Sequence, residues 1–441
     1  MDSRYSLRRA FLRISISSVI RPTRPFWVAL SGFVAALLAA TLTGFLVPAT
    51  ASASPLKPPS HDPFYGTQRS LDHVAPGTPL KTRVVQLSYG DNRFPAVATQ
   101  ILFRTTDQFG MPTAAVTSII EPLTSGPRKL ISYHSPYDAL GSQCDPSYAL
   151  RGGNTGRGPE FDDIIIGSFL AQGYTVVVPD YEGLKMRWTM GRESAQTALD
   201  SIRTAQRHLR LPSSTPVGLF GYSGGSVPTG FGADLAANYA PELHIVGAAA
   251  GGVLVQPSHN LPYVNGSKQW AGVIPALMNV YNATFDLNIG QYLSPKGTQT
   301  LAQTQGQCLI NFATKYPGLT DTQLLLPQYP GLLTVPGIPQ AFNQNIMGWV
   351  GKPRNPMFLG VGNVDGTGDG IMIDGDVQGL ATKYCREGVP TQYRTYPKLS
   401  HFDAFLPWAP DAEKFLADRF AGRPATYCSG IPTGNTLGPI S

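Results

Sequence analysis

The sequence predicts an α/β fold in which a mostly parallel sheet is flanked by helices and carries a largely helical cap. Three observations support this fold class. A short apolar strand runs into Gly-Tyr-Ser-Gly-Gly at 221–225, and 226–239 can continue as a helix. The segment 173–179 is apolar almost throughout, as expected of a strand buried on both faces of a parallel sheet. Helical spacing at 192–211 lies between these strands, which is the alternation of a parallel sheet.

The first 53 residues have the features of a secretory signal peptide and are excluded from the fold. Six arginines precede an apolar run at 26–47, and Ala51-Ser52-Ala53 offers a small-x-small cleavage site. The alternative is an uncleaved anchor, because the run is long enough to span a bilayer. The segment 7–12 resembles a twin-arginine signal, so the export route stays open.

The composition of the remainder is that of a large globular protein. The 441 residues are 42% hydrophobic and 14% charged, which suffices for one elaborated domain or a domain with an insertion. The leader contains six arginines and one aspartate, so its removal lowers the formal charge from +6 to about +1. No nucleic-acid-binding footprint remains.

The chain after the leader is predicted to form a core in two parts, 54–255 and 353–441, separated by a cap at 256–352. A Pro-, Ser- and Gly-rich arm at 54–78 precedes an antiparallel start of the sheet. The expected strands are 82–89, 98–105, 113–121, 129–134, 173–179, 217–222, 243–255, 356–362 and 391–396. The expected helices of the core are 192–211, 226–239, 374–387 and 410–420, and the tail from 422 is irregular.

The cap segment breaks this alternation. It is rich in proline and glycine, and it contains long apolar pieces at 270–281 and 324–335. We expect most of these pieces to form the core of the cap itself, with a minority facing a ligand.

The pentapeptide 221–225 predicts a serine held on a tight turn between a strand and a helix, the nucleophile elbow of α/β-hydrolases. Gly221 and Gly225 would avoid side-chain collisions in that turn and leave the Ser223 hydroxyl pointing into a cleft. The chain order of such enzymes is serine, acid, histidine. Of seven histidines only His401 follows a candidate acid, and it lies in the loop expected after the last strand.

Two candidates for the acid lie in the loop after 356–362, Asp365 and Asp369. Asp365 comes sooner after the strand. We favour Asp369, since Ile371-Met372-Ile373 can bury beneath the loop and hold its carboxylate for the triad. The other aspartate would orient the loop, and although two aspartates can attract a cation, such a loop is more often a turn.

The oxyanion hole of this fold takes one backbone N–H from the residue after the nucleophile and one from an earlier loop. These are predicted to be Gly224 and Asp138, the latter in the loop after 129–134. An ordinary turn or helix-capping aspartate is the alternative for Asp138.

Four cysteines lie far apart, and an exported protein with an even count is expected to form disulfides. Three connectivities are possible, of which we favour Cys144 with Cys308 and Cys385 with Cys428. No Cys-x-x-Cys pair suggests zinc or redox chemistry.

Four motifs together resemble the secretory lipase family of α/β-hydrolases over most of the chain after the leader. They are 179–184 (PDYEGL), 221–225 (GYSGG), 247–252 (GAAAGG) and a Gly-Thr-x-Asp loop before a helix ending in Cys385. The resemblance implies a triacylglycerol lipase or esterase with a helical cap.

The resemblance also implies roles for single residues. The triad of the family matches Ser223, Asp369 and His401, its oxyanion aspartate is similar in position to Asp138, and its two disulfides resemble the favoured pairing. The Gly-Thr-Ala-Asp of the family matches 366–369, but an insertion placed later would match Asp365 instead.

The predicted function is therefore secreted ester hydrolysis through an acyl-enzyme, without metal or organic cofactor. The partner is a lipid or ester substrate, and transient contact with a lipid–water interface is compatible with it; the oligomeric state is not specified. An acyltransferase or a small-ester or cell-wall esterase would use the same triad. A noncatalytic binding protein on this scaffold would be expected to lack a triad member, and none is missing.

Overall fold

The structure is a computed structural model that describes residues 56–89, 92–153, 160–425 and 427–441. The predicted signal peptide at 1–53 lies outside the described residues. Among the residues described, no helix combines the length and apolarity needed to cross a membrane.

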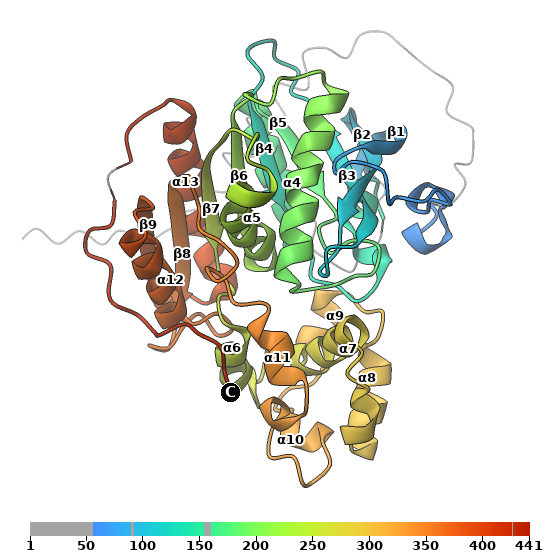
Figure 1. The fold of residues 1–441 in the computed structure, drawn as a ribbon, viewed down its shortest axis with the longest axis vertical. Helices are drawn as coiled ribbons and strands as arrows, with labels where there is room; N and C mark the ends of the chain where they lie inside the picture. The colour runs from blue at the N-terminus through green and yellow to red at the C-terminus, as the bar shows by residue number, and fades with distance from the viewer. Residues whose placement is uncertain (1–55, 90–91, 154–159, 426) are drawn as a thin grey trace, which may run out of the picture. The chain divides into compact units, whose positions relative to one another are not determined.

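The core of the described chain is a single sheet of nine strands in the order β1-β2-β3-β5-β4-β6-β7-β8-β9 (Figure 1). The strands are β1 (Pro79–Tyr89), β2 (Asn92–Thr106), β3 (Pro112–Ile120), β4 (Leu130–His134), β5 (Thr175–Pro179), β6 (Val217–Tyr222), β7 (Ile245–Gly251), β8 (Met357–Asn363) and β9 (Thr391–Pro397). Strands β1, β2, β3 and β5 pair antiparallel, and β5, β4, β6, β7, β8 and β9 pair parallel. The predicted mostly parallel sheet with an antiparallel start is confirmed.

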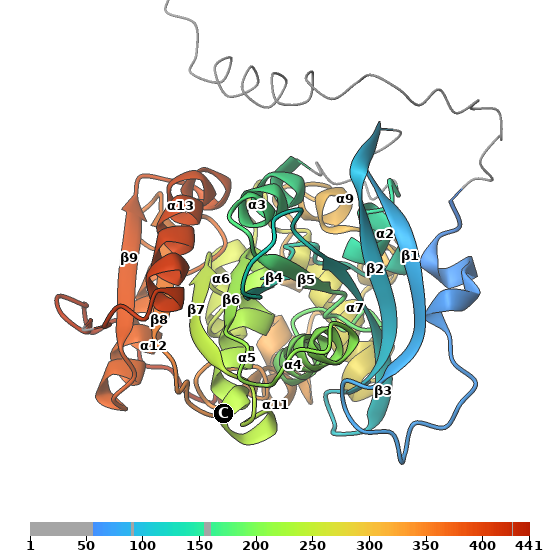
Figure 2. The same cartoon turned by 90° about the horizontal axis from the view of Figure 1, so that it is seen from above.

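Helices cover both faces of the sheet. They are α2 (Pro146–Ala149), α3 (Glu160–Ala171), α4 (Gly191–His208), α5 (Ser226–Tyr239), α12 (Asp374–Arg386) and α13 (His401–Phe420). Figure 2 shows α3 and α13 on one face and α4, α5 and α12 on the other. Each face has its own buried apolar cluster, because successive strand residues such as Leu219 and Phe220 point to opposite faces.

Three helices of the core differ from the sequence prediction. The helices α2 and α3, which lie between β4 and β5 in the chain, were not predicted. The last helix was expected at 410–420 with His401 in a loop, but α13 begins at His401 and includes Pro407 and Pro410. A proline interrupts helical hydrogen bonding. Here the burial of Trp408 against the sheet maintains the helix across both prolines.

The segment between β7 and β8 is helical, as expected for the cap. Its helices are α6 (Pro257–Val264), α7 (Val273–Phe285), α8 (Pro295–Thr304), α9 (Leu309–Ala313), α10 (Asp321–Leu324) and α11 (Ile338–Asn343), with short 3₁₀ turns η5 (Ile289–Tyr292) and η6 (Leu332–Thr334). A buried apolar cluster consists almost entirely of residues from this segment, joined by Trp188 and Met190 of the core. Most apolar pieces of the cap therefore form its own core.

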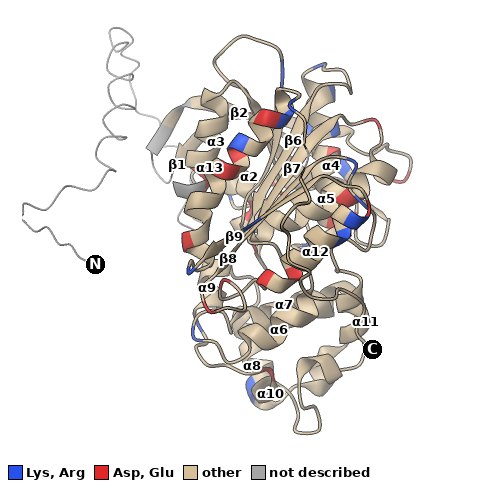
Figure 3. Cartoon of the chain, turned by 90° about the vertical axis from the view of Figure 1, so that its left-hand side faces the viewer, with Lys and Arg blue, Asp and Glu red and all other residues tan. Residues whose placement is uncertain are grey.

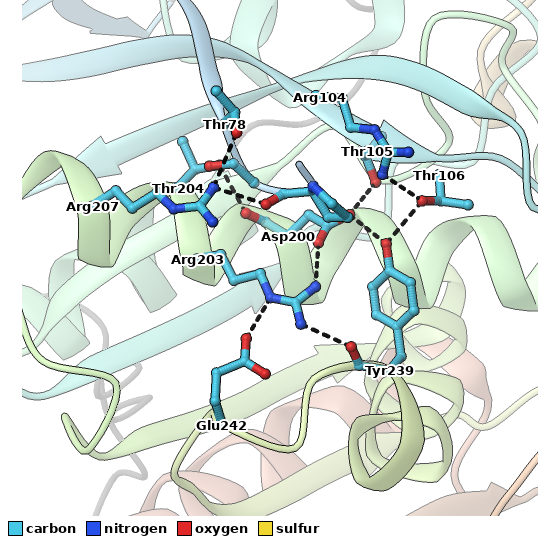
Figure 4. Close-up of polar contacts among 12 residues, drawn as sticks. Thr78, Arg104, Thr105, Thr106, Asp200, Arg203, Thr204, Arg207, Tyr239 and Glu242 are labelled. Carbon is cyan, nitrogen blue, oxygen red and sulfur yellow. Dashed lines mark hydrogen bonds and ion pairs between the residues drawn. The ribbon is translucent and has the colours of Figure 1, made fainter. Parts of the chain in front are cut away.

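A cluster of buried polar groups attaches α4 to the antiparallel strands (Figure 4). Asp200 accepts hydrogen bonds from the Thr105 hydroxyl at 2.8 Å, the Tyr239 hydroxyl at 2.7 Å and the Arg203 guanidinium at 2.8 Å. Arg203 also donates to Glu242 at 2.6 Å. Burial raises the pKa of Asp200, and its hydrogen bonds with Arg203 and Tyr239 act in the opposite direction.

The described residues after α13 form no helix or strand, as predicted for the tail. A disulfide joins Cys428 to Cys385 at the end of α12. Further on, the tail reaches α11, where Asn343 donates to the Ile440 carbonyl and accepts from the Ile440 N–H, each at 2.8 Å.

Candidate active site

The residues singled out by sequence meet at the carboxyl ends of the parallel strands. Asp138 follows β4, Ser223 follows β6, Asp369 follows β8, and His401 follows β9. Carboxyl ends of neighbouring parallel strands lie at the same edge of a sheet, which is where ligands bind in open α/β folds. The structure thus brings together four side chains that are up to 263 positions apart in the chain.

Ser223 occupies a strained turn between β6 and the 3₁₀ turn η4 (Ser223–Gly225). Its φ of 56° lies in the left-handed region that side chains other than glycine rarely adopt. A side chain at Gly221 would meet the Gly225 carbonyl at 2.1 Å, and one at Gly225 would meet the His134 carbonyl at 2.0 Å. The two glycines are therefore needed for the close backbone approach, as the sequence predicted.

Ser223, His401 and Asp369 form one hydrogen-bonded chain. The Ser223 hydroxyl lies 2.7 Å from His401 Nε2, and His401 Nδ1 lies 2.7 Å from Asp369 Oδ2. A carboxylate only accepts, so Nδ1 carries the proton and Nε2 is left to accept from the serine hydroxyl. This arrangement can activate a serine as a nucleophile.

Asp369 is held by its own turn. Its Oδ1 atom accepts hydrogen bonds from the backbone N–H groups of Ile371 at 3.1 Å and Met372 at 2.7 Å, and its own N–H donates to the Met372 carbonyl. The His401 N–H in turn donates to the Asp369 carbonyl at 2.8 Å. The carboxylate is therefore fixed with its second oxygen toward the imidazole.

Asp365, the alternative acid, is engaged elsewhere. Its carboxylate accepts from the backbone N–H groups of Thr367 at 2.8 Å and Gly368 at 3.0 Å, and from the Tyr263 hydroxyl at 2.9 Å. Slight burial acts to raise the pKa of Asp365, but these hydrogen bonds outweigh it and the pKa is lowered. The structure thus places Asp369, and not Asp365, beside His401.

Asp138 lies against the residue that follows the nucleophile. A side chain at Gly224 would meet Asp138 Oδ1 at 1.8 Å, so glycine is required there. Trp188 Nε1 donates to Asp138 Oδ1 at 2.7 Å, and the backbone of Asp138 has a φ of 36°. Nothing in the sequence indicated that Trp188 belongs to this site, because a single tryptophan after a strand is commonly a residue of the hydrophobic core.

Two aromatic residues that sequence reasoning missed border the imidazole. The Tyr222 hydroxyl donates to the His401 carbonyl at 2.6 Å, and burial raises the pKa of Tyr222 well above its usual range, so it stays a donor. Trp270 of the cap packs edge-on to the His401 ring at 5.6 Å. Tyr222 lies inside the pentapeptide 221–225, whereas Trp270 belongs to an apolar piece whose direction the sequence did not reveal.

Two cavities border Ser223. The larger, of about 170 Å³, is lined by Asp162, Tyr222, Trp270, Ile310, His401 and Phe402 among others. The smaller, of about 50 Å³, lies under the cap and is lined by Asp138, Gly224, Trp188, Leu261, Val264 and Val273 among others. Both are mostly apolar, so the polar chain at Ser223 faces space suited to apolar groups.

A disulfide joins the loop after β4 to the cap. Cys144 in the 3₁₀ turn η3 (Ser142–Cys144) bonds to Cys308, the residue before α9. Beside it the Leu309 N–H donates to the Asp138 carbonyl at 3.0 Å. Both disulfides of the structure have the pairing that the sequence analysis favoured. Among the described residues, no group of three or more acidic, cysteine or histidine side chains is placed to hold a metal ion.

Comparison with known proteins agrees with this geometry. The sequence profile described as "Secretory lipase" matches residues 156–428, more than half of the chain. The chain belongs to the secretory lipase family. A relative named a probable inactive lipase, from Mycobacterium tuberculosis, is 33% identical over 83% of this chain and 84% of its own. Lipase 10 of Candida albicans is 31% identical over 86% of this chain and 85% of its own.

Solved structures show the same fold for this secretory lipase family member. Candida antarctica lipase A in its closed state aligns with a TM-score of 0.76 at 30% identity, covering 88% of this chain and 91% of that structure. The rice cell wall degrading esterase LipA of Xanthomonas oryzae aligns with a TM-score of 0.59 at 18% identity, covering 79% and 98%, and shows the fold alone. The α/β-hydrolase fold is confirmed, and the family places the chain among carboxylic-ester hydrolases.

Proposed function

We propose that this chain is a secreted serine ester hydrolase of the triacylglycerol lipase type. Ser223 is the nucleophile, His401 the general base, and Asp369 the acid that orients the imidazole. The observation that carries the proposal is the hydrogen-bonded chain from Asp369 through His401 to Ser223, which ends at two apolar cavities.

The reaction proceeds through an acyl-enzyme. His401 takes the proton of Ser223 as Oγ attacks the ester carbonyl, and the imidazolium, steadied by Asp369, returns it to the leaving alcohol. Water then attacks the acyl-enzyme with the same proton transfers in reverse. Backbone N–H groups at Gly224 and Asp138 bind the oxyanion, and one such donor is typically worth about 3 kcal/mol of the barrier.

The two cavities suggest where each part of the substrate lies. The leaving oxygen must be near His401, which lines the larger cavity and not the smaller one. The oxyanion residues Gly224 and Asp138 line the smaller one. We assign the alcohol to the larger cavity and the start of the acyl chain to the smaller one, beneath the cap at 256–352.

The mouth of the larger cavity is suited to a lipid–water interface. Ile310 and Phe402 line it and are each 45% exposed, and Leu406 on the next turn of α13 is 53% exposed. The cap contributes only six charged residues over 256–352, and its helices are mostly uncharged in Figure 3. Large exposed apolar side chains at a site entrance mark a surface that contacts lipid or protein.

Secretion is part of the proposal. The features of a signal peptide at 1–53, two disulfides and the secretory family all favour a protein that works outside the cytosol.

An esterase for short acyl chains is the second candidate, and the small volume of the cavity assigned to the acyl chain favours it. Hydrolysis of p-nitrophenyl esters from acetate to palmitate by the chain from Ser54 onward tests both, with Ser223→Ala as the control. A rate that rises toward long chains and vanishes in Ser223→Ala supports the lipase, and hydrolysis of acetate alone supports the esterase. Absence of hydrolysis, as the name of the mycobacterial relative suggests for that protein, would refute both.

A further inference from the structure

We propose that helix α6 of the cap holds the turn that carries Asp369, through the side chains of Tyr263 and Asn260. Both are then positioning residues for the proposed triad, and the inference rests on the proposed function. In Figure 1, α6 lies at the junction between the sheet and the other helices of the cap.

The turn 369–372 satisfies part of its own hydrogen bonding and leaves two backbone groups for the cap. Within the turn, Asp369 bonds to the N–H groups of Ile371 and Met372 and to the Met372 carbonyl. The Gly370 N–H donates to the Tyr263 hydroxyl at 2.9 Å, and Asn260 Nδ2 donates to the Ile371 carbonyl at 2.5 Å. Two side chains of one short helix therefore hold the backbone on either side of a single peptide bond, directly after the acid.

The orientation of the Tyr263 hydroxyl is fixed by a second partner, Asp365. Its one proton is donated to Asp365 Oδ2 at 2.9 Å, which leaves its oxygen free to accept from Gly370. Asp365 is itself anchored by the N–H groups of Thr367 and Gly368. Asp365, the aspartate of this loop that does not contact His401, thus anchors Tyr263.

The loop needs an external hold because it is rich in glycine. Glycines at 366, 368 and 370 alternate along it, and Gly370 has a φ of 103°, which side chains rarely adopt. Glycine loses more conformational freedom on folding than any other residue. Without Tyr263 and Asn260 the turn would sample other conformations and increase the distance from Asp369 Oδ2 to His401 Nδ1.

The same helix also lines the proposed acyl cavity. Leu261 and Val264 of α6 border the smaller cavity, as does Asn260. The position of α6 therefore affects both the acyl cavity and the acid, and a displacement of the cap at this helix removes hydrogen bonds from the turn of Asp369.

Tyr263→Phe tests the inference, because it removes one hydroxyl and keeps the ring. The readouts are kcat and KM for p-nitrophenyl acetate, and the rate at which diethyl p-nitrophenyl phosphate phosphorylates Ser223. We expect kcat and the phosphorylation rate to fall together by about tenfold with KM changed less than about twofold, since small misplacements of catalytic groups cost up to about a hundredfold. Asn260→Leu, which keeps the branched shape of the side chain without its polar atoms, is expected to act in the same direction.

His259→Leu is the matched control on the same helix. His259 Nδ1 lies 2.9 Å from Asp376 Oδ1 in α12, so this variant also loses a bond between cap and core but leaves the acid turn intact. We expect kcat and the phosphorylation rate of His259→Leu to equal those of the wild type.

Wild-type values for Tyr263→Phe, or an equal loss in His259→Leu, would overturn the inference. If Tyr263→Phe does not fold, the same comparison of Asn260→Leu with His259→Leu decides. A wild-type chain without Ser223-dependent hydrolysis would instead refute the proposed function, and that result is known before any variant of α6 is compared.

Discussion

Asp200 in α4 and Asp369 after β8 are both buried carboxylates with a nitrogen partner at hydrogen-bond distance. Asp200 is bonded to Arg203 at 2.8 Å, and Asp369 to His401 at 2.7 Å. Every further bond of the Asp200 cluster ends on another protein group, as Figure 4 shows. The chain from Asp369 ends on Ser223, which borders two cavities.

The comparison shows that burial and pairing of a carboxylate do not identify a functional site. A cluster in which every hydrogen bond ends on another protein group fixes how helices and strands pack. Here the cluster of Asp200 attaches α4 to β2 through Thr105. A chain of hydrogen bonds that ends at a cavity leaves one group for a ligand. None of the residues labelled in Figure 4 lines either cavity beside Ser223.

The largest expected effect is the loss of kcat when Asp369 is replaced, compared with the loss when Asp365 is replaced. Asp369→Asn places an amide where the imidazole needs an acceptor, which disfavours the required tautomer and costs about 10⁴ in kcat. Asp365→Asn alters the contacts of Asp365 with Tyr263, Thr367 and Gly368, none of which reaches the imidazole, and should cost at most about tenfold. Hydrolysis of p-nitrophenyl butyrate by both variants measures this, and a larger loss in Asp365→Asn would exchange the roles of the two aspartates.

The next largest expected effect is on the free energy of unfolding, when the cation beside Asp200 is removed. Arg203→Met leaves Asp200 buried without its cation, and removal of one partner of a buried ion pair costs about 3–5 kcal/mol. Arg207→Met on the exposed side of the same helix, labelled in Figure 4, should cost less than about 1 kcal/mol. Urea unfolding measures both. The folded fraction of Arg203→Met should keep its kcat, and loss of kcat there would show that the cluster of Asp200 also serves the site.

The smallest effect concerns the pair formed by the partly exposed His259 and the buried Asp376. The hydrogen bond to Asp376 raises the pKa of His259 above its usual 6.5. The stabilisation is therefore complete below pH 6.5 and is lost as the pH rises through the raised pKa. We expect the wild type to exceed His259→Leu in free energy of unfolding by less than about 1 kcal/mol at pH 6, and by less still at pH 9. A difference that grows with pH would contradict this assignment of charge.

Much of the fold could be predicted because its signals are local. Each strand of the sheet has an apolar or alternating pattern bounded by turn residues, and the serine turn has a motif whose glycines avoid backbone collisions. The start of α13 could not be predicted, because Pro407 and Pro410 are local signals against a helix and burial of Trp408 overrides them.

Chain order was the main signal for the candidate site, and the apolar residues 371–373 favoured Asp369 over Asp365 as the acid. That order selected His401 among seven histidines, but it could not choose between Asp365 and Asp369, which are four residues apart in one glycine-rich loop. Their placement depends on Tyr263, which is over a hundred residues away in the sequence. The short helices of the cap had no periodic pattern long enough to reveal which side chains face the serine.

The disulfide between Cys144 and Cys308 relates the site to the redox state of its surroundings. It ties the loop of Asp138 to the cap across 164 positions of sequence. Thiols stay reduced in the cytosol and pair in oxidising compartments. The loop of Asp138 therefore gains its covalent tie to the cap only where the chain is exposed to an oxidant, and a reducing environment would leave this loop and the cap joined by noncovalent contacts alone.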